Sequence, residues 1–160
     1  MVPPLPTVEA FGALVSMLIG KNVSVKRGTP LTTPNVRGAA TYVDAAGALT
    51  FVVLIDVAFL ASAGAALALI PLPLVTEAVR TGKPSEGLVE NAYEVLNVAA
   101  SLFNDVEGTP VHVKVERLMT GPLDAELAKR IVKPGARYDR DIAIPGYLEG
   151  KVSFIALSQG

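Results

Sequence analysis

The polar residues whose types and spacing could support chemistry are concentrated between positions 86 and 104. Glutamate, asparagine and serine recur there every three or four residues, which is the spacing of one helical face: Glu90, Glu94, Asn97, Ser101 and Asn104. At about 100° per residue these five positions fall within a sector of roughly 80°. Apolar residues occupy the other side: Leu88, Ala92, Val95, Ala99, Leu102 and Phe103. The spacing therefore predicts one helix over about 86–104, with a polar stripe facing outward.

An ordinary solvated surface is the simplest explanation for such a stripe. Two features weaken this explanation. The stripe has no lysine or arginine, so it lacks the Glu–Lys pairs that are common on exposed helices. Asn97 lies in the middle of the predicted helix, where asparagine costs several tenths of a kcal/mol relative to alanine and no capping role explains it. A carboxamide can donate to and accept from a water molecule at neutral pH without changing its charge.

The composition of the chain excludes several other kinds of site. It has 160 residues, of which 51% are hydrophobic and 18% charged, with a formal net charge of −1. This length predicts a single domain over 1–160. The balanced charge argues against binding nucleic acid or an anionic membrane through bulk charge. With no cysteine and a single histidine, His112, we expect no thiolate nucleophile and no metal site.

The stretch from 57 to 75 carries no charge and could be read as a membrane span. Asp56 precedes it, however, and Pro71 and Pro73 limit it to about fourteen helical residues, fewer than the roughly 20 that a span needs. We therefore expect a helix in the protein core and no membrane span. The N-terminal Met-Val-Pro-Pro has no basic region typical of a signal peptide, so a cytoplasmic location is expected.

The remaining patterns predict the elements that position the stripe. Helical spacing follows the candidate cap Thr7 as far as Gly20. Further helices are expected over 57–70 and 74–80, and Ser85 is the candidate cap of the helix that carries the stripe. Strands are expected over 22–27, 36–43, 48–55, 111–115, 138–144 and 151–157. Residues 123–132 fit either a short helix or a variable insertion. This order predicts an α+β fold with helices packed on a mostly antiparallel sheet.

The stripe resembles the signature helix of the CheC/CheX-type chemotaxis phosphatases. Glu90, Glu94 and Asn97 have the spacing of the acidic residue, the glutamate and the asparagine in that family, and 93–104 is similar to the sequence around its Glu-x-x-Asn motif. The order of elements agrees over roughly 8–157. On the first helix Glu9 is followed by Gly12 where a second motif would have asparagine, so the resemblance is to the single-site, CheX-like pattern.

This resemblance implies a phosphatase that hydrolyses the aspartyl phosphate of a CheY-like receiver domain. The catalytic residues would be Asn97, which positions the attacking water, and Glu94, which contacts a lysine of the receiver. Glu90 and Ser101 would help to bind the substrate. The resemblance implies no cofactor of the chain's own, because Mg²⁺ belongs to the response regulator, and it implies a homodimer.

A second hypothesis is that the same fold binds a receiver or another signalling partner without hydrolysing its phosphate. A carrier of small ligands, built around the apolar helix that begins at Val57, is a weaker alternative because no set of polar contacts can be named for it.

Overall fold

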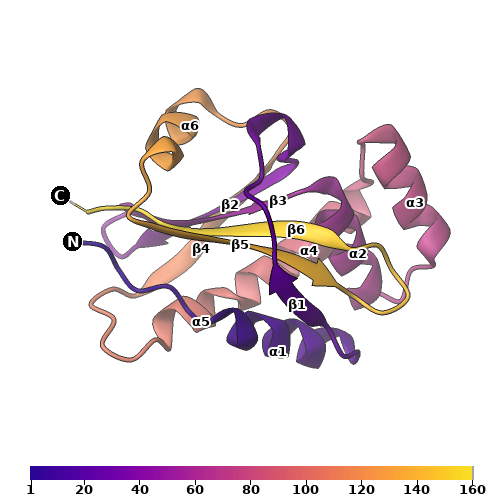
Figure 1. Ribbon diagram of the computed structural model, residues 1–160, viewed down its shortest axis with the longest axis horizontal. Coiled ribbons are helices and arrows are strands. Elements are labelled where there is room, and N and C mark those ends of the chain that lie inside the picture. Colours follow the sequence, from indigo (N-terminus) through magenta and orange to yellow (C-terminus); the bar gives the residue numbers. More distant parts are fainter. Residues whose placement is uncertain (160) are drawn as a thin grey trace.

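The computed structural model describes residues 1–159, which form six strands and six α-helices around one sheet (Figure 1). The strands are β1 (Ser24–Arg27), β2 (Gly38–Asp44), β3 (Leu49–Ile55), β4 (Val113–Thr120), β5 (Ala136–Ala143) and β6 (Gly150–Ala156). The helices are α1 (Val8–Ile19), α2 (Val57–Leu67), α3 (Leu72–Thr81), α4 (Glu86–Val98), α5 (Ala100–Asn104) and α6 (Ala125–Val132), with a short 3₁₀ turn, η1 (Thr33–Asn35).

The sheet has the strand order β1-β5-β6-β3-β2-β4, and every neighbouring pair is antiparallel. β2–β3 and β5–β6 are the two hairpins that the sequence predicts. β1 and β4 are the two edges of the sheet. The α+β fold with a mostly antiparallel sheet is therefore confirmed.

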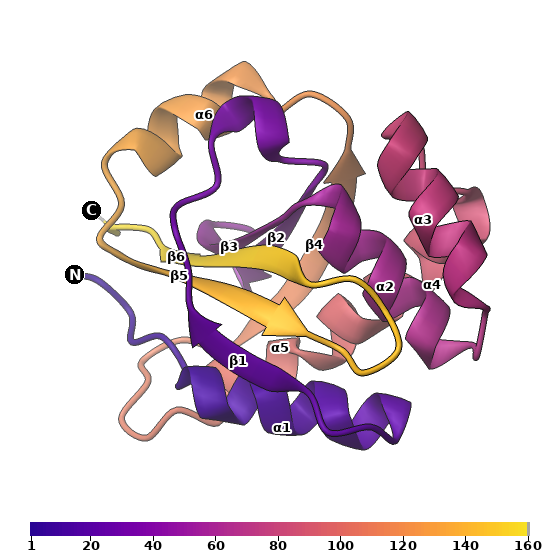
Figure 2. The same cartoon turned by 45° about the vertical axis from the view of Figure 1, so that its right-hand side comes forward.

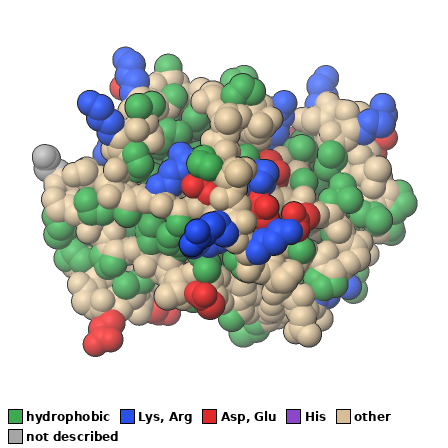
Figure 3. Space-filling model, in the orientation of Figure 1, with side chains coloured by type: hydrophobic (Ala, Val, Ile, Leu, Met, Phe, Trp, Pro, Cys, Tyr) green, Lys and Arg blue, Asp and Glu red, His purple; other side chains and the backbone are tan. Residues whose placement is uncertain are grey.

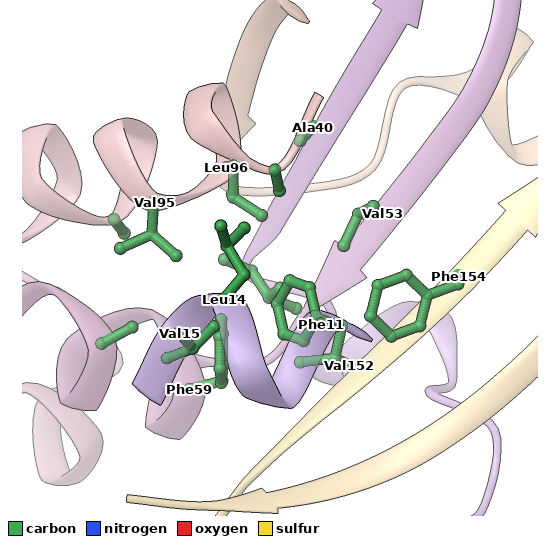
Figure 4. Close-up of a cluster of buried hydrophobic side chains, with 14 of the residues drawn as sticks. Phe11, Leu14, Val15, Ala40, Val53, Phe59, Val95, Leu96, Val152 and Phe154 are labelled. Atoms are coloured by element: carbon green, nitrogen blue, oxygen red, sulfur yellow. The ribbon is translucent and has the colours of Figure 1, made fainter. Parts of the chain in front are cut away.

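Helices α1, α4 and α5 cover one face of the sheet, and α6 covers part of the other (Figures 1 and 2). The main core lies between the sheet and four helices, α1, α2, α4 and α5. Figure 4 shows side chains from α1, α2, α4 and three strands meeting there, including Phe11, Phe59, Val95, Leu96 and Phe154. The predicted apolar faces of α1 and of the stripe-bearing helix are both in this core, with Phe11, Val15, Val95, Ala99 and Phe103 buried. The hydrophobic helix α2 is a core helix, as expected.

The predicted helix starts are also confirmed. The Thr7 hydroxyl accepts a hydrogen bond from the Ala10 N–H, and the Ser85 hydroxyl accepts one from the Leu88 N–H. Asp56, immediately before α2, accepts from the Phe59 N–H at 2.8 Å. Each of these side chains satisfies a backbone donor that has no partner within its own helix. Gly20 ends α1 in the left-handed conformation, with φ 69°.

Several predicted boundaries need correction. The helix expected over 57–70 ends at Leu67, and the helix expected over 74–80 begins at Leu72. The single helix over 86–104 is divided at Ala99, where the Leu102 N–H binds the Ala99 carbonyl and tightens the turn. The strand predicted over 111–115 runs instead from Val113 to Thr120, and exposed His112 lies just before it. Residues 125–132 form α6, so the helix was the right alternative for that segment.

The surface seen in Figure 3 carries both signs of charge side by side in its middle. Strands β1, β5 and β6, with the turn before β6, contribute three close ion pairs: Lys26 with Glu149 at 3.1 Å, Lys151 with Asp141 at 2.8 Å, and Arg137 with Asp139 at 3.0 Å. The opposite charges within these pairs partly neutralise each other.

None of the helices within 1–159 is both long and apolar enough to cross a membrane.

Candidate functional site

The four predicted site residues lie along one surface of α4 and α5. Glu90, Glu94 and Asn97 belong to α4, Ser101 belongs to α5, and all four are exposed. The division at Ala99 does not interrupt the stripe, because Ala99 keeps a right-handed helical conformation (φ −62°, ψ −16°). The apolar side of both helices is buried against the sheet, so the polar stripe faces outward.

Glu94 and Asn97 have free side chains. They are three residues apart, which places them on adjacent helical turns. Within residues 1–159, neither side chain takes part in a hydrogen bond or ion pair with another side chain or with the backbone. Carboxylate and carboxamide are thus available together to an approaching molecule.

Ser101 and Asn104 are already engaged. The Ser101 hydroxyl donates to the Val98 carbonyl at 2.9 Å. Asn104, which the helical spacing places on the exposed stripe, is half-buried and structural: its amide donates to the Val113 carbonyl at 2.8 Å and its amide oxygen accepts from the Val113 N–H at 2.7 Å. The prediction of an exposed Asn104 was wrong because the start of β4 passes beside α5.

Tyr42 fixes the end of α4 just before Asn97. Its buried hydroxyl donates to the Leu96 carbonyl at 2.6 Å, and burial raises the pKa of this phenol well above its ordinary value. The Tyr42 ring contacts that of Phe103, which also stacks on Phe51. The hydrogen bond and these rings hold both halves of the stripe-bearing helix on the sheet.

Helix α2 supports the other side of α4. The Asn91 amide donates to the Gly64 carbonyl at 3.0 Å. At Gly64 there is no room for a side chain, because a Cβ there would collide with the Leu88 carbonyl. The two helices therefore approach each other closely at a glycine, and this sets the position of the first half of the stripe.

A pocket of about 470 Å³ adjoins the stripe between α4 and β4. It is lined by Val89, Glu90, Asn91, Tyr93, Glu94 and Leu118. Three of these lining residues were not predicted from the sequence: Val89, Tyr93 and Leu118. Tyr93 lies between the two glutamates and could have been noticed, but Leu118 is brought in from β4, and no local sequence signal places it there.

The site has a strongly one-sided charge. From position 84 to 113 the acidic residues are Glu86, Glu90, Glu94, Asp105 and Glu107, with no lysine or arginine among them. Within 1–159, Glu90 and Glu94 are in no ion pair. This surface is suited to a partner that presents positive charge.

The chemistry available here is that of binding and orientation. In the part of the chain that the structure describes, no three His, Asp or Glu side chains are grouped so that they could hold a metal ion. Asn97 can orient a water molecule, and the carboxylates can bind a cationic side chain.

Comparison with solved structures identifies the fold. A chain of the FliM–SpeE complex from H. pylori matches with a TM-score of 0.64 and 10% identity, over 93% of this chain and 80% of that one. Thermotoga maritima FliY gives 0.60 and 12%, over 92% and 82%. A chain of the CheX–CheY–BeF3–Mg²⁺ complex from Borrelia burgdorferi gives 0.59 and 10%, over 94% and 95%. The chain has the CheX-type fold. No family model and no curated protein matches the sequence.

Within this CheX-type fold, Gly12 lies where α1 packs on the edge of the sheet. Gly12 is buried, and a Cβ at this position would lie 2.9 Å from the Val25 side chain of β1. The glycine lets α1 approach the edge strand closely. Gly12 is therefore a packing position.

Proposed function

We propose that this chain is a phosphatase that hydrolyses the aspartyl phosphate of a CheY-like receiver domain. The observation that carries the proposal is the pair of free, exposed side chains of Glu94 and Asn97 on adjacent turns of α4. The CheX-type fold supports it, because one similar structure is a complex of CheX with CheY, BeF3 and Mg²⁺. The proposal places the protein in the cytoplasm, with its receiver partner.

In the proposed reaction, Asn97 holds a water molecule in line with the phosphorus atom. The water oxygen forms a bond to phosphorus while the bond from phosphorus to the aspartyl oxygen breaks, and a water proton passes to the phosphate that leaves. Positioning and charge compensation account for most of the barrier reduction in such transfers. The receiver supplies the Mg²⁺, which compensates charge on the phosphoryl group.

The two glutamates and Ser101 would bind the receiver. Glu94 would form a charge-assisted hydrogen bond with a receiver lysine, and Glu90, one turn earlier, would add attraction at the edge of the contact. Ser101 would contact the receiver at the other end of the stripe, exchanging its bond to the Val98 carbonyl for one to the partner.

The second candidate function is a module that binds a receiver or another signalling partner without catalysis. It is favoured by the similarity to a chain of the FliM–SpeE complex, which is an assembly of two proteins. In that case the wild-type chain would bind but would not accelerate loss of phosphate.

Phosphate release from a panel of phosphorylated receiver domains distinguishes these functions. Wild type should accelerate release from at least one receiver, and Asn97→Ala should abolish this acceleration while leaving binding nearly intact. Glu94→Ala should weaken both, with a loss of affinity of roughly tenfold to a hundredfold. Asn22→Ala, which removes an exposed asparagine outside the stripe, is the matched control and should change neither. Undiminished hydrolysis by Asn97→Ala would contradict the mechanism.

A further inference from the structure

The pocket between α4 and β4 has an apolar floor and an acidic rim. Val89, Tyr93 and Leu118 are half-buried and pack against the main core. Glu90 and Glu94 line the same pocket, and their side chains are exposed. Such a combination suits a side chain that has both a long apolar part and a positive charge, because the methylene groups can cover the floor while the charge reaches the carboxylates.

The pocket has room for the chain that would carry this side chain. A second hollow of about 370 Å³ lies next to it and shares Val89 as a lining residue. It is bounded by the turn after α3, by the end of β4 and by one cationic side chain; the remaining lining residues are Arg37, Gly82, Pro84, Thr120, Gly121 and Pro122. The two hollows meet at Val89, beside the end of β4.

From this geometry we propose that the pocket binds one arginine side chain of the docking partner. Arginine fits better than lysine for two reasons. Its planar guanidinium has five N–H donors and can bridge two carboxylates that are one helical turn apart. It is also less strongly hydrated than an ammonium group and binds well beside an aromatic ring such as that of Tyr93.

This inference deepens the proposed function, since it describes a second contact for the same partner, but it does not depend on catalysis. Asn97 is outside the residues that line the pocket. The arginine would bind Glu90 and one carboxylate oxygen of Glu94, and the receiver lysine would bind the other oxygen of Glu94. A partner with the lysine but without the arginine would bind more weakly.

The test is a nuclear magnetic resonance titration of the full chain with labelled Val and Leu methyl groups. The probe is Nα-acetyl-arginine amide, and the matched probe is Nα-acetyl-citrulline amide, which has the same shape without the charge. The arginine probe should shift the methyl signals of Val89 and Leu118 with saturation, and it should bind about three- to tenfold more tightly than the citrulline probe.

Variants then localise the binding. Glu90→Gln should weaken arginine binding by a similar factor, whereas Glu86→Gln, the same change on the same helix but outside the pocket, should not. Asn97→Ala should retain full binding of the probe even if it abolishes phosphate release, so that failure of this inference and failure of the proposed function can be told apart. Equal binding of both probes, an equal effect of Glu86→Gln, or no saturable shift at Val89 and Leu118 would overturn the inference.

Discussion

Asn97 and Asn104 occupy the same helical stripe, yet their side chains have different surroundings. Asn97 makes no side-chain hydrogen bond within 1–159, whereas Asn104 binds both the N–H and the carbonyl of Val113. The first is free to meet a partner, and the second connects α5 to the start of β4. Residue type and spacing alone could not separate these two roles.

This difference predicts opposite effects on stability. Changing both Glu94 and Asn97 to alanine should alter the free energy of unfolding by no more than about 0.5 kcal/mol, because exposed helix positions without contacts contribute little. Asn104→Ala should lower it by about 1–3 kcal/mol, because two backbone groups lose their partner. Denaturant unfolding of both variants measures these changes. A large loss in the double variant would mean that the candidate site is structural.

The elements around the stripe were largely predictable from local signals. Thr7, Gly20 and Ser85 mark helix ends through their capping chemistry, and α1 has the limits that they predict. The course of β4 was not predictable, because a β-bulge shifts its register against β2. Val113 and Val115 face the main core, but the next core-facing residue is Leu118 rather than a residue at 117. The alternation of core-facing and outward-facing residues along β4 therefore breaks after Val115.

The close approach of α2 and α4 predicts a severe effect of a single methyl group. Gly64→Ala should lower the free energy of unfolding by about 1–3 kcal/mol, because the added Cβ collides with the backbone carbonyl of Leu88. The displaced α4 should also lose its function, whether this is catalysis or binding.

Gly87→Ala, in the first turn of α4, is the control for this change. A Cβ there has only the Ser85 hydroxyl oxygen nearby, at 3.9 Å, so stability should stay the same or rise by about 0.5 kcal/mol. Thermal and denaturant unfolding compare the two variants. Similar behaviour of both would show that the contact between α2 and α4 can relax.

The cap of α2 predicts a dependence on pH. Burial raises the pKa of the Asp56 carboxyl, although its hydrogen bond from the Phe59 N–H acts in the opposite direction. Because the folded-state pKa lies above the unfolded value of about 3.9, the contribution of Asp56 to stability is fully present below that pH and is lost as the pH rises through the raised pKa.

Asp56→Asn keeps a good capping residue and removes the charge. Its free energy of unfolding should match that of wild type in acid and should exceed it increasingly as the pH rises through the raised pKa. Asp56→Ala should lose about 1 kcal/mol through the missing cap. Urea unfolding at a series of pH values tests both variants. An advantage of wild type over Asp56→Asn that grows with pH would contradict the assigned direction.

At the scale of the whole molecule, the charge is distributed unevenly. Residues 84–113, which include the stripe, contain five acidic residues and no lysine or arginine, whereas the middle of the surface in Figure 3 carries close pairs of opposite sign. The net charge of −1 is a sum over the whole chain and does not reveal this uneven distribution. The acidic helices and the neutralised strands therefore offer different surfaces to different partners.

The two edges of the sheet lead to the prediction of a homodimer. An edge strand has unpaired N–H and carbonyl groups that a second copy can cover around a twofold axis. β4 has eight residues and β1 has four, so β4 offers the longer edge, and it also lies beside the pocket through Leu118. Light scattering should give twice the monomer mass at micromolar concentrations and above.

Hydrogen exchange identifies the edge that is used. In an antiparallel edge strand, alternate N–H groups point away from the sheet and exchange readily unless a partner strand binds them. On raising the protein concentration through the dimerisation range, these amides in 113–120 should become protected, while those in 24–27 should not change. Protection confined to 24–27 would transfer the interface to β1. A monomer mass throughout, with unprotected amides on both edges, would refute the dimer.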